Sequence, residues 1–384
     1  MSTFGSVPEA RAYLAAVAEP PAAALGALVD VFGPVRAAGR VRTGDVPDAV
    51  RRETAARRQR VSAVEVLRAT ESAGARLVTP EDSEWPAAAF VAFGLAGFPH
   101  LCAPLALWVR GPARMAELAE RSAAIVGARA ATSYGLHVAG SLGYGVADLG
   151  CAVVSGAAYG IDGAAHRGAL AAGGTTVAVL ACGVDRVYPS GHARLLGAIG
   201  EQGAVLSEYP PGSVPARHRF LVRNRLIAGL AAGTVVVEAG WRSGARRTAS
   251  DAGLLGRPVM AVPGPVTSAL SAGAHQLLRE PGTVAVTRAE EVLEAVGRIG
   301  VDLAPPGGPV AEDPGRSASP TIRRVYEALP ARDSSGLGEL SAESGLPLDV
   351  VRSALPELAA AGLVARTGGG AWRRVARSPG CGDA

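Results

Sequence analysis

The chain has 384 residues, which is room for two or three domains, one of them with a substantial core. Its 38 basic and 34 acidic residues give a net charge of +4, which permits a nucleic-acid partner without requiring one. All of these basic residues are arginines, because the sequence contains no lysine. A P-loop needs a lysine on the nucleotide phosphates and a pyridoxal enzyme needs a Schiff-base lysine, so these two classes are excluded.

The first 80 residues predict a domain of helices, from stretches such as ARAYLAAVAE and SAVEVLRATESAGARL. We expect residues 1–80 to form an N-terminal helical domain of the SAM-like or helix-hairpin-like kind. Residues 85–109 then carry no formal charge, but prolines and a histidine divide them into short pieces. This segment is expected to be a connector that lines the core rather than a membrane span.

Residues 81–298 predict a domain of the α/β class. Short apolar runs alternate there with helix-like stretches, and each run is followed by glycine or polar residues. The strand candidates are residues 123–127, 151–156, 175–183, 203–208, 234–240 and 258–264. Continuous apolar strands that alternate with helices predict a parallel sheet covered on both faces.

The C-terminal part predicts a linker and a small further domain. Residues 299–320 are rich in proline, glycine and serine, as linkers are. Residues 321–375 suggest three helices followed by a hairpin, which is the winged-helix pattern. The wing would carry Arg366, Arg373 and Arg374. We favour a solvated surface or a protein contact for these arginines, with DNA contact as the alternative.

Cysteine and histidine spacing gives no sign of a metal site. The four cysteines lie far apart without a C-x-x-C pair, and the six histidines show no H-E-x-x-H pattern. We therefore expect no metal and no cofactor. The N-terminus has acidic residues and prolines where a signal peptide would be basic and then apolar. A cytoplasmic protein is expected.

The loops after three predicted strands are the expected place for a ligand, because open parallel sheets bind ligands at the carboxyl ends of their strands. These loops are GARAATSYG, SGAAYGIDGAAH and GWRSGARRT, and each opens a helix. Small residues let the backbone approach a ligand, and helix N-termini favour anions. With the nearby arginines, the loops predict a phosphate-binding cleft, although packing explains each loop alone equally well.

No catalytic constellation can be assembled from these loops. Gly127 and Gly135 lack the spacing of a nicotinamide-binding G-x-G-x-x-G, and Ser155 lacks the preceding glycine of G-x-S-x-G. Asp162 and His166 lie four residues apart, so we expect them to share a helix face in an internal hydrogen bond or a cap. The protein is expected not to be an enzyme.

The stretch RFLVRNRLIAGL, residues 219–230, places four polar side chains in an apolar helix that leads into a buried strand. They are Arg219, Arg223, Asn224 and Arg225. A buried guanidinium must be paired, and Glu238 at the end of the next strand is a candidate partner.

Ordered blocks over residues 105–290 resemble the DNA-processing protein A family (DprA, also called Smf). They include VGARAATSYG, VVSGAAYGIDGAAHRGAL, GAVLSEYPPG, RFLVRNRLIAGL and VVEAGWRSGARRTA. The resemblance implies an extended Rossmann-like, parallel-rich sheet domain with an N-terminal helical domain and a C-terminal winged helix. It implies a protein that binds single-stranded DNA without sequence specificity, protects it and helps load RecA recombinase in transformation and recombination. It also implies a homodimer formed through the Rossmann-like domain.

The resemblance assigns site residues as well. It implies that Arg129, Arg217 and Phe220 contact the strand, and guanidiniums suit phosphates while an aromatic face suits a base of any identity. The predicted DNA-binding set is Gly127, Arg129, Ser155, Gly156, Arg217, Phe220, Arg223, Asn224, Arg225, Ser243, Gly244 and Arg247. Some of residues 223–225 are expected to brace the loops instead. No local motif identifies a RecA contact.

Two other functions stay open. A duplex-DNA-binding regulator would act through the winged helix and prefer a duplex sequence. A nucleotide phosphoribohydrolase-like enzyme would share the sheet, but its P-G-G-x-G-T-x-x-E loop is replaced here by EAGWRSGARRTAS.

Overall fold

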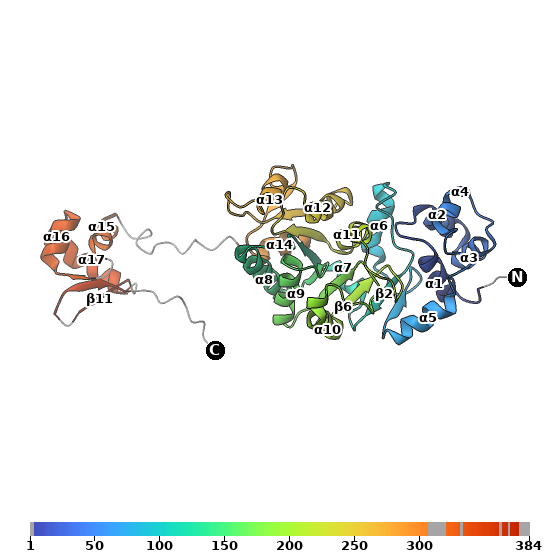
Figure 1. The fold of residues 1–384 in the computed structure, drawn as a ribbon. Helices are drawn as coiled ribbons and strands as arrows, with labels where there is room; N and C mark the ends of the chain where they lie inside the picture. The colour runs from blue at the N-terminus through green and yellow to red at the C-terminus, as the bar shows by residue number, and fades with distance from the viewer. Residues whose placement is uncertain are drawn as a thin grey trace. The chain divides into compact units, whose positions relative to one another are not determined.

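The computed structural model describes residues 4–298, 300–305, 320–330, 333–360, 363–367 and 369–375. The chain divides into two compact units, Met1–Ala304 and Pro305–Ala384 (Figure 1). Each unit has a hydrophobic core of its own. Most of the linker predicted over residues 299–320 lies outside the described residues.

A nine-stranded sheet forms the centre of the first unit, in the order β1-β2-β6-β5-β4-β3-β7-β8-β9. The strands from β6 across to β9 are parallel, whereas β2 is antiparallel to both β6 and β1. Their bounds are β1 Arg76–Val78, β2 Leu107–Arg110, β3 Ser122–Val126, β4 Ala152–Ser155, β5 Thr176–Leu180, β6 Ala204–Ser207, β7 Gly233–Val236, β8 Val259–Ala261 and β9 Thr283–Ala285.

The six predicted strands all occur in this sheet, each inside its predicted range or one residue beyond it. Strands β1, β2 and β9 were not predicted. Strands β1 and β9 are partly or mostly exposed and so lack the buried apolar run of the predicted strands, and β2 ends the uncharged segment that was predicted to be a connector. The parallel-rich α/β architecture is confirmed.

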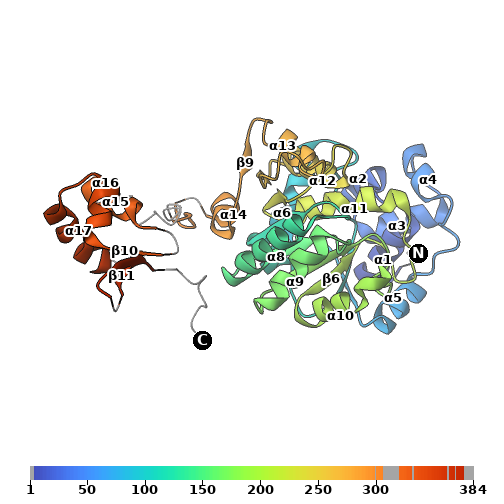
Figure 2. The same cartoon turned by 60° about the vertical axis from the view of Figure 1, so that its left-hand side comes forward.

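Helices cover both faces of the sheet, because successive strand residues point to opposite sides and both sides are apolar. Ile125 and Val153 pack with α8, α9 and α14 on one face, while Ala124 and Val154 share a core with α6, α7, α11, α12 and α13 on the other. The bounds are α6 Ala87–Ala96, α7 Met115–Glu120, α8 Ser133–Asp148, α9 Ile161–Ala171, α10 Ala193–Gln202, α11 Arg217–Leu230, α12 Gly244–Leu254, α13 Ala272–Leu277 and α14 Ala289–Val296. Helices α8 and α9 lie side by side in Figure 2.

The N-terminal helices are α1 Val7–Val17, α2 Ala23–Phe32, α3 Pro34–Thr43, α4 Asp48–Thr54 and α5 Ala63–Ser72. They share a core with the β2 end of the sheet, where Tyr13 and Leu14 belong to the same apolar cluster as Trp108. The Trp108 indole also donates a hydrogen bond to Thr70 Oγ1 at 2.9 Å. The helical N-terminus is confirmed, and its separation at residue 80 stays a prediction.

The uncharged segment of residues 85–109 forms α6, a connection and most of β2. Phe90, Phe93, Leu101 and Leu107 from it are buried in the core of the sheet domain. Among the described residues, none of the helices is both long and apolar enough to cross a membrane.

The second unit has the element order of a winged helix. Its elements are α15 Pro320–Ala328, β10 Ser334–Ser335, α16 Leu337–Ser344, α17 Leu348–Ala360, β11 Val364–Arg366 and β12 Trp372–Arg374. The three strands form an antiparallel sheet in the order β10-β12-β11, and Val325, Leu340 and Leu355 fill the core. This arrangement confirms the predicted fold of the C-terminal part.

Candidate nucleic-acid interface

A cavity of about 240 Å³ lies where the strand order of the sheet reverses. From β3 the chain continues to β4 on one side, and from β6 it returns through α11 to β7 on the other side of β3. Ligands of open α/β sheets bind in the crevice at such a point. We call this cavity the cleft. Seven predicted site residues line it: Gly127, Arg129, Phe220, Arg223, Asn224, Ser243 and Gly244.

The loops after β3 and β7 approach each other so closely that Gly127 is required. A Cβ at this position would lie 2.5 Å from Ile161 Cγ1 and 2.8 Å from the carbonyl oxygen of Glu238. The neighbouring Ala128 N–H donates to that same carbonyl at 2.7 Å. The backbone contact fixes the position of the loop that carries Arg129.

Glu238 clamps these loops and does not pair with an arginine, so the predicted pairing is wrong. Its fully buried carboxylate accepts from Thr132 N at 2.9 Å and from Thr132 Oγ1 at 2.5 Å. Thr132 is the N-cap of α8, where a negative charge is stabilising. The carboxylate is therefore turned toward α8, away from the arginines of α11.

Arg223 braces the cleft from inside. Its Nη1 donates to the carbonyl oxygen of Gly156 at 2.9 Å and also to that of Val179. A Cβ on Gly156 would lie 2.5 Å from both terminal nitrogens of this guanidinium, which explains the glycine. Burial lowers the pKa of Arg223 to about 10, so it remains charged at neutral pH. The side chain thus ties α11 to the ends of β4 and β5.

Asp162 holds the loop after β4 through two of its backbone N–H groups. It is buried at the start of α9 and accepts from the N–H of Gly156 at 3.1 Å and of Ala158 at 3.4 Å. Burial raises the pKa of Asp162, and Arg223 acts in the opposite direction. His166 turns instead to Thr176 Oγ1, 2.7 Å from its Nδ1, and burial lowers its pKa to about 3.

Arg225 has a different partner, Glu208 at the end of β6. Its Nη2 lies 2.7 Å and 2.8 Å from the two carboxylate oxygens, and the side chains are 2% and 7% exposed. Burial raises the pKa of Glu208, which would favour a neutral acid. Two short contacts with a guanidinium that stays protonated favour the ion pair, and this is the state that we assign.

The exposed rim of the cleft combines a cation with aromatic rings. The Arg129 guanidinium carbon lies 5.2 Å from the centroid of the Phe220 ring, and Phe220 lies 5.2 Å from Tyr188. Arg129 is exposed, and no other described residue engages its guanidinium in a hydrogen bond or an ion pair. Tyr188 was not predicted, although an aromatic residue in a strand-end loop is a signal that could have identified it.

The N-terminus of α12 closes the other side of the cleft. Ser243 caps this helix by accepting from Ala245 N at 3.3 Å. Asn224 Nδ2 donates to the carbonyl of Gly244 at 3.4 Å, which connects α11 to the capped turn. The helix end presents positive partial charge toward the cleft.

Five predicted residues do not line the cleft. Ser155 is buried and its hydroxyl donates to Ile125 O at 2.6 Å. Gly156 lies behind Arg223, and Arg217 is exposed at the first position of α11. Arg225 and Arg247 line a neighbouring cavity, where Arg247 pairs with Asp251 at 2.9 Å. Across the described residues, no group of three or more His, Cys, Asp and Glu side chains could hold a metal ion.

Comparison with known proteins assigns the chain that forms this cleft to a family. The sequence profile of DNA recombination-mediator protein A matches residues 76–297. A Mycobacterium tuberculosis relative that carries the name DprA is 52% identical over 376 residues, covering 95% of this chain and 94% of the relative. The chain belongs to the DNA recombination-mediator protein A family. The resemblance predicted from the ordered blocks is therefore confirmed.

The family relationship extends to a solved structure. DprA of Streptococcus pneumoniae is 41% identical over 191 residues, which are 50% of this chain and 66% of that protein. Its X-ray structure aligns with a TM-score of 0.62 and 29% identity, and the alignment covers 75% of this chain and 96% of that chain. The family match runs from β1 to the end of α14, so it contains the whole sheet and every wall of the cleft.

Proposed function

We propose that this DprA-family chain binds single-stranded DNA without sequence specificity in the cleft, protects it and helps load a RecA-type recombinase. The observation that supports this most directly is the rim, where the unengaged guanidinium of Arg129 lies beside the Phe220–Tyr188 ring pair. A guanidinium suits a phosphate, and an aromatic face suits an unpaired base. Base faces are covered by stacking in a duplex, so this pairing favours a single strand.

The lack of sequence preference follows from the kinds of group at the cleft. Backbone N–H groups, a helix N-terminus and ring faces are available there, and none of these distinguishes one base edge from another. Asn224 could read a base edge, but its amide nitrogen is directed to the Gly244 carbonyl. Arg223 is held by two carbonyls and braces the cleft.

The described lining of the cleft does not favour catalysis. Asp162 is the one carboxylate among the described residues that line the cleft, and it is directed to two backbone N–H groups. General acid–base chemistry or nucleotide hydrolysis would need a further acid or base beside it. From the family membership we further propose that the chain acts in the cytoplasm and has two protein partners. These are a RecA-type recombinase and a second copy of the chain, docked through the Rossmann-like domain.

The winged helix is the weaker candidate for DNA binding. Helix α17 is the one that would enter a major groove, and its exposed charges are Asp349, Arg352 and Glu357, a net charge of −1. On the wing, Arg374 donates to the carbonyls of Tyr326 and Glu327 at 3.0 and 3.1 Å. Helix α17 therefore offers little attraction to a phosphate backbone.

Fluorescence anisotropy with labelled oligo-dT and a matched duplex, across a salt series, tests the proposal. Arg129→Ala should weaken oligo-dT binding about tenfold or more, since charge-assisted contacts are worth about 1.5–3 kcal/mol. The slope of log K against log salt should fall by about 0.7. Arg68→Ala, which removes an exposed arginine of α5, serves as the charge-matched control. Equal affinity for duplex and single strand, with Arg129→Ala unchanged, would overturn the proposal.

A further inference from the structure

A second cavity, of about 550 Å³, adjoins the cleft at the N-terminus of α12. Leu221, Ser243 and Gly244 line both cavities. A ligand that crosses this helix end can therefore reach both. We call it the second cavity.

Positive charge dominates the lining of the second cavity. Arg225, Arg242 and Arg247 contribute three positive charges, and Asp251 contributes one negative charge. The difference is two positive charges, and Glu208, which contacts Arg225 from behind, offsets one of them. Arg242 is exposed and has no ion pair or hydrogen bond to any described residue. An anion would find an available guanidinium at this position.

Arg225 supplies an independent sign of a missing acceptor. Its Nη2 contacts Glu208, but its Nε and Nη1 have no hydrogen-bond partner among the described residues, although the side chain is 2% exposed. Buried donors are paired in the great majority of cases, and an unpaired donor on a charged group is costly. His100 Nε2, in the same lining, makes no hydrogen bond but lies 3.8 Å from Asp251 Oδ1, so it gives no such sign. The Nε and Nη1 of Arg225 are therefore the donors for which the described residues provide no acceptor.

We propose that the second cavity binds a further phosphate of the same DNA strand, so that the strand crosses the N-terminus of α12. This inference rests on the proposed function of the cleft. A phosphodiester suits the site because its oxygens accept from several guanidinium nitrogens at once. Helix α12 has eleven residues and a capped N-terminus, so its end adds positive partial charge between the two cavities.

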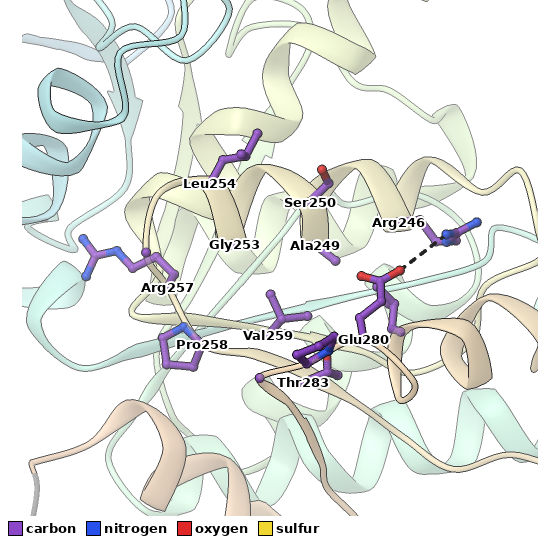
Figure 3. A pocket seen from close by; sticks show the side chains of 14 residues that line it. Arg246, Ala249, Ser250, Gly253, Leu254, Arg257, Pro258, Val259, Glu280 and Thr283 are labelled. Atoms are coloured by element: carbon purple, nitrogen blue, oxygen red, sulfur yellow. Dashed lines mark ion pairs between the residues drawn. The ribbon is translucent and has the colours of Figure 1, made fainter.

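Arg242→Ala tests this subsite, with Arg246→Ala as the matched control. Both substitutions remove one arginine at the start of α12. Arg246, however, faces a different cavity, of about 640 Å³, and its Nη2 lies 3.8 Å from Glu280 (Figure 3). Anisotropy is measured on the full chain with labelled oligo-dT of about two nucleotides, too short to occupy both cavities, and of about twenty nucleotides, longer than the site sizes of single-strand binders.

The expected result depends on oligonucleotide length. Arg242→Ala weakens binding of the long strand about fivefold and lowers its salt slope by about 0.7, and it leaves the short strand, held by the cleft, nearly unchanged. Arg246→Ala leaves the affinity for the long and for the short strand unchanged, whereas Arg129→Ala weakens binding of both strands. If Arg242→Ala and Arg246→Ala behave alike, the subsite is refuted while the cleft stands. If the wild type binds neither strand, the proposed function and the subsite fail together.

A free phosphate is the other source of the same chemistry. Inorganic phosphate is therefore added to the wild type and to Arg242→Ala in a thermal-unfolding series. Stabilisation of the wild type alone, without any length-dependent DNA effect, would assign the second cavity to a free anion and overturn the strand proposal.

Discussion

The buried pair of Arg225 and Glu208 allows a direct test of how the arginines of α11 are used. Arg225→Met leaves the Glu208 carboxylate buried without its partner, and Glu208→Leu leaves the Arg225 charge alone. Because both side chains are nearly inaccessible and joined at 2.7 and 2.8 Å, each single substitution should cost about 3–5 kcal/mol of unfolding free energy. The double variant should recover most of that loss, because apolar side chains can replace a buried pair.

The two single variants should differ in their response to pH. Burial already raises the pKa of Glu208, and removal of Arg225 raises it further. When the pKa of Glu208 is higher in the folded chain than in the unfolded chain, the folded state is favoured at low pH. This contribution to stability is lost as pH rises through the folded pKa. Arg225→Met should therefore be closer to the wild type at about pH 5 than at about pH 7.5, whereas Glu208→Leu should show no such recovery, since arginine does not lose its proton.

Urea denaturation followed by tryptophan fluorescence measures these free energies, because Trp85, Trp108 and Trp241 all lie in the first unit. The wild type at each pH is the reference for the general effect of acid. Single variants that lose less than about 1 kcal/mol, or a double variant as unstable as the sum of the singles, would refute the buried ion pair as we assign it.

Three further predictions concern the cleft and its supports. Gly156→Ala should destabilise the chain by about 1–3 kcal/mol and weaken oligo-dT binding, because its Cβ would lie 2.5 Å from the Arg223 nitrogens; equal urea midpoints would contradict this. Phe220→Leu should weaken oligo-dT binding by about 1–3 kcal/mol in anisotropy while thermal unfolding changes little, and an unchanged affinity would remove the stacking role. Burial acts to raise the pKa of Glu19, but hydrogen bonds from Arg219 and Arg57 outweigh it and lower this pKa. The Glu19 carboxylate therefore stabilises the folded chain above its unfolded pKa, and this stabilisation is lost as pH falls through its folded pKa. Glu19→Gln should flatten this acid limb of the stability curve, and an unaltered limb would argue against it.

The main strands and the position of the cleft were predictable from the sequence for physical reasons. Buried parallel strands are apolar on both faces, so their runs stand out as continuous hydrophobic segments. Their carboxyl ends meet at one edge of the sheet, so the loops with Gly127 and Ser243 had to lie near each other. Strand β9, Thr283–Ala285, was not predicted because it lies at the edge of the sheet and is mostly exposed, so its sequence lacks the buried apolar run of the inner strands.

The partners of the buried arginines could not be predicted from sequence patterns. Arg223 donates to carbonyls 67 and 44 residues away, and a backbone carbonyl has no signature in the sequence. Arg225 and Glu208 are 17 residues apart and belong to different elements. Glu238 was a reasonable partner by position alone, but its carboxylate accepts hydrogen bonds from Thr132 instead. Which partner a buried side chain contacts depends on how whole helices and strands are oriented when they pack.

The different environments of the arginines follow from one property of the side chain. A guanidinium stays protonated even when burial lowers its pKa to about 10, as for Arg223, and its fork reaches two carbonyls at once. Buried arginines can therefore hold the strand-end loops rigid. Arg225 is paired with Glu208, so Arg223 is the buried arginine that adds a positive charge beside the cleft. Arg129 is left exposed. Its guanidinium contacts the Phe220 ring but has no hydrogen bond or ion pair to a described residue, so it breaks no such bond when a phosphate arrives. The buried Arg223 and Arg225 thus fix the shape of the cleft, and the exposed Arg129 is available to bind a phosphate.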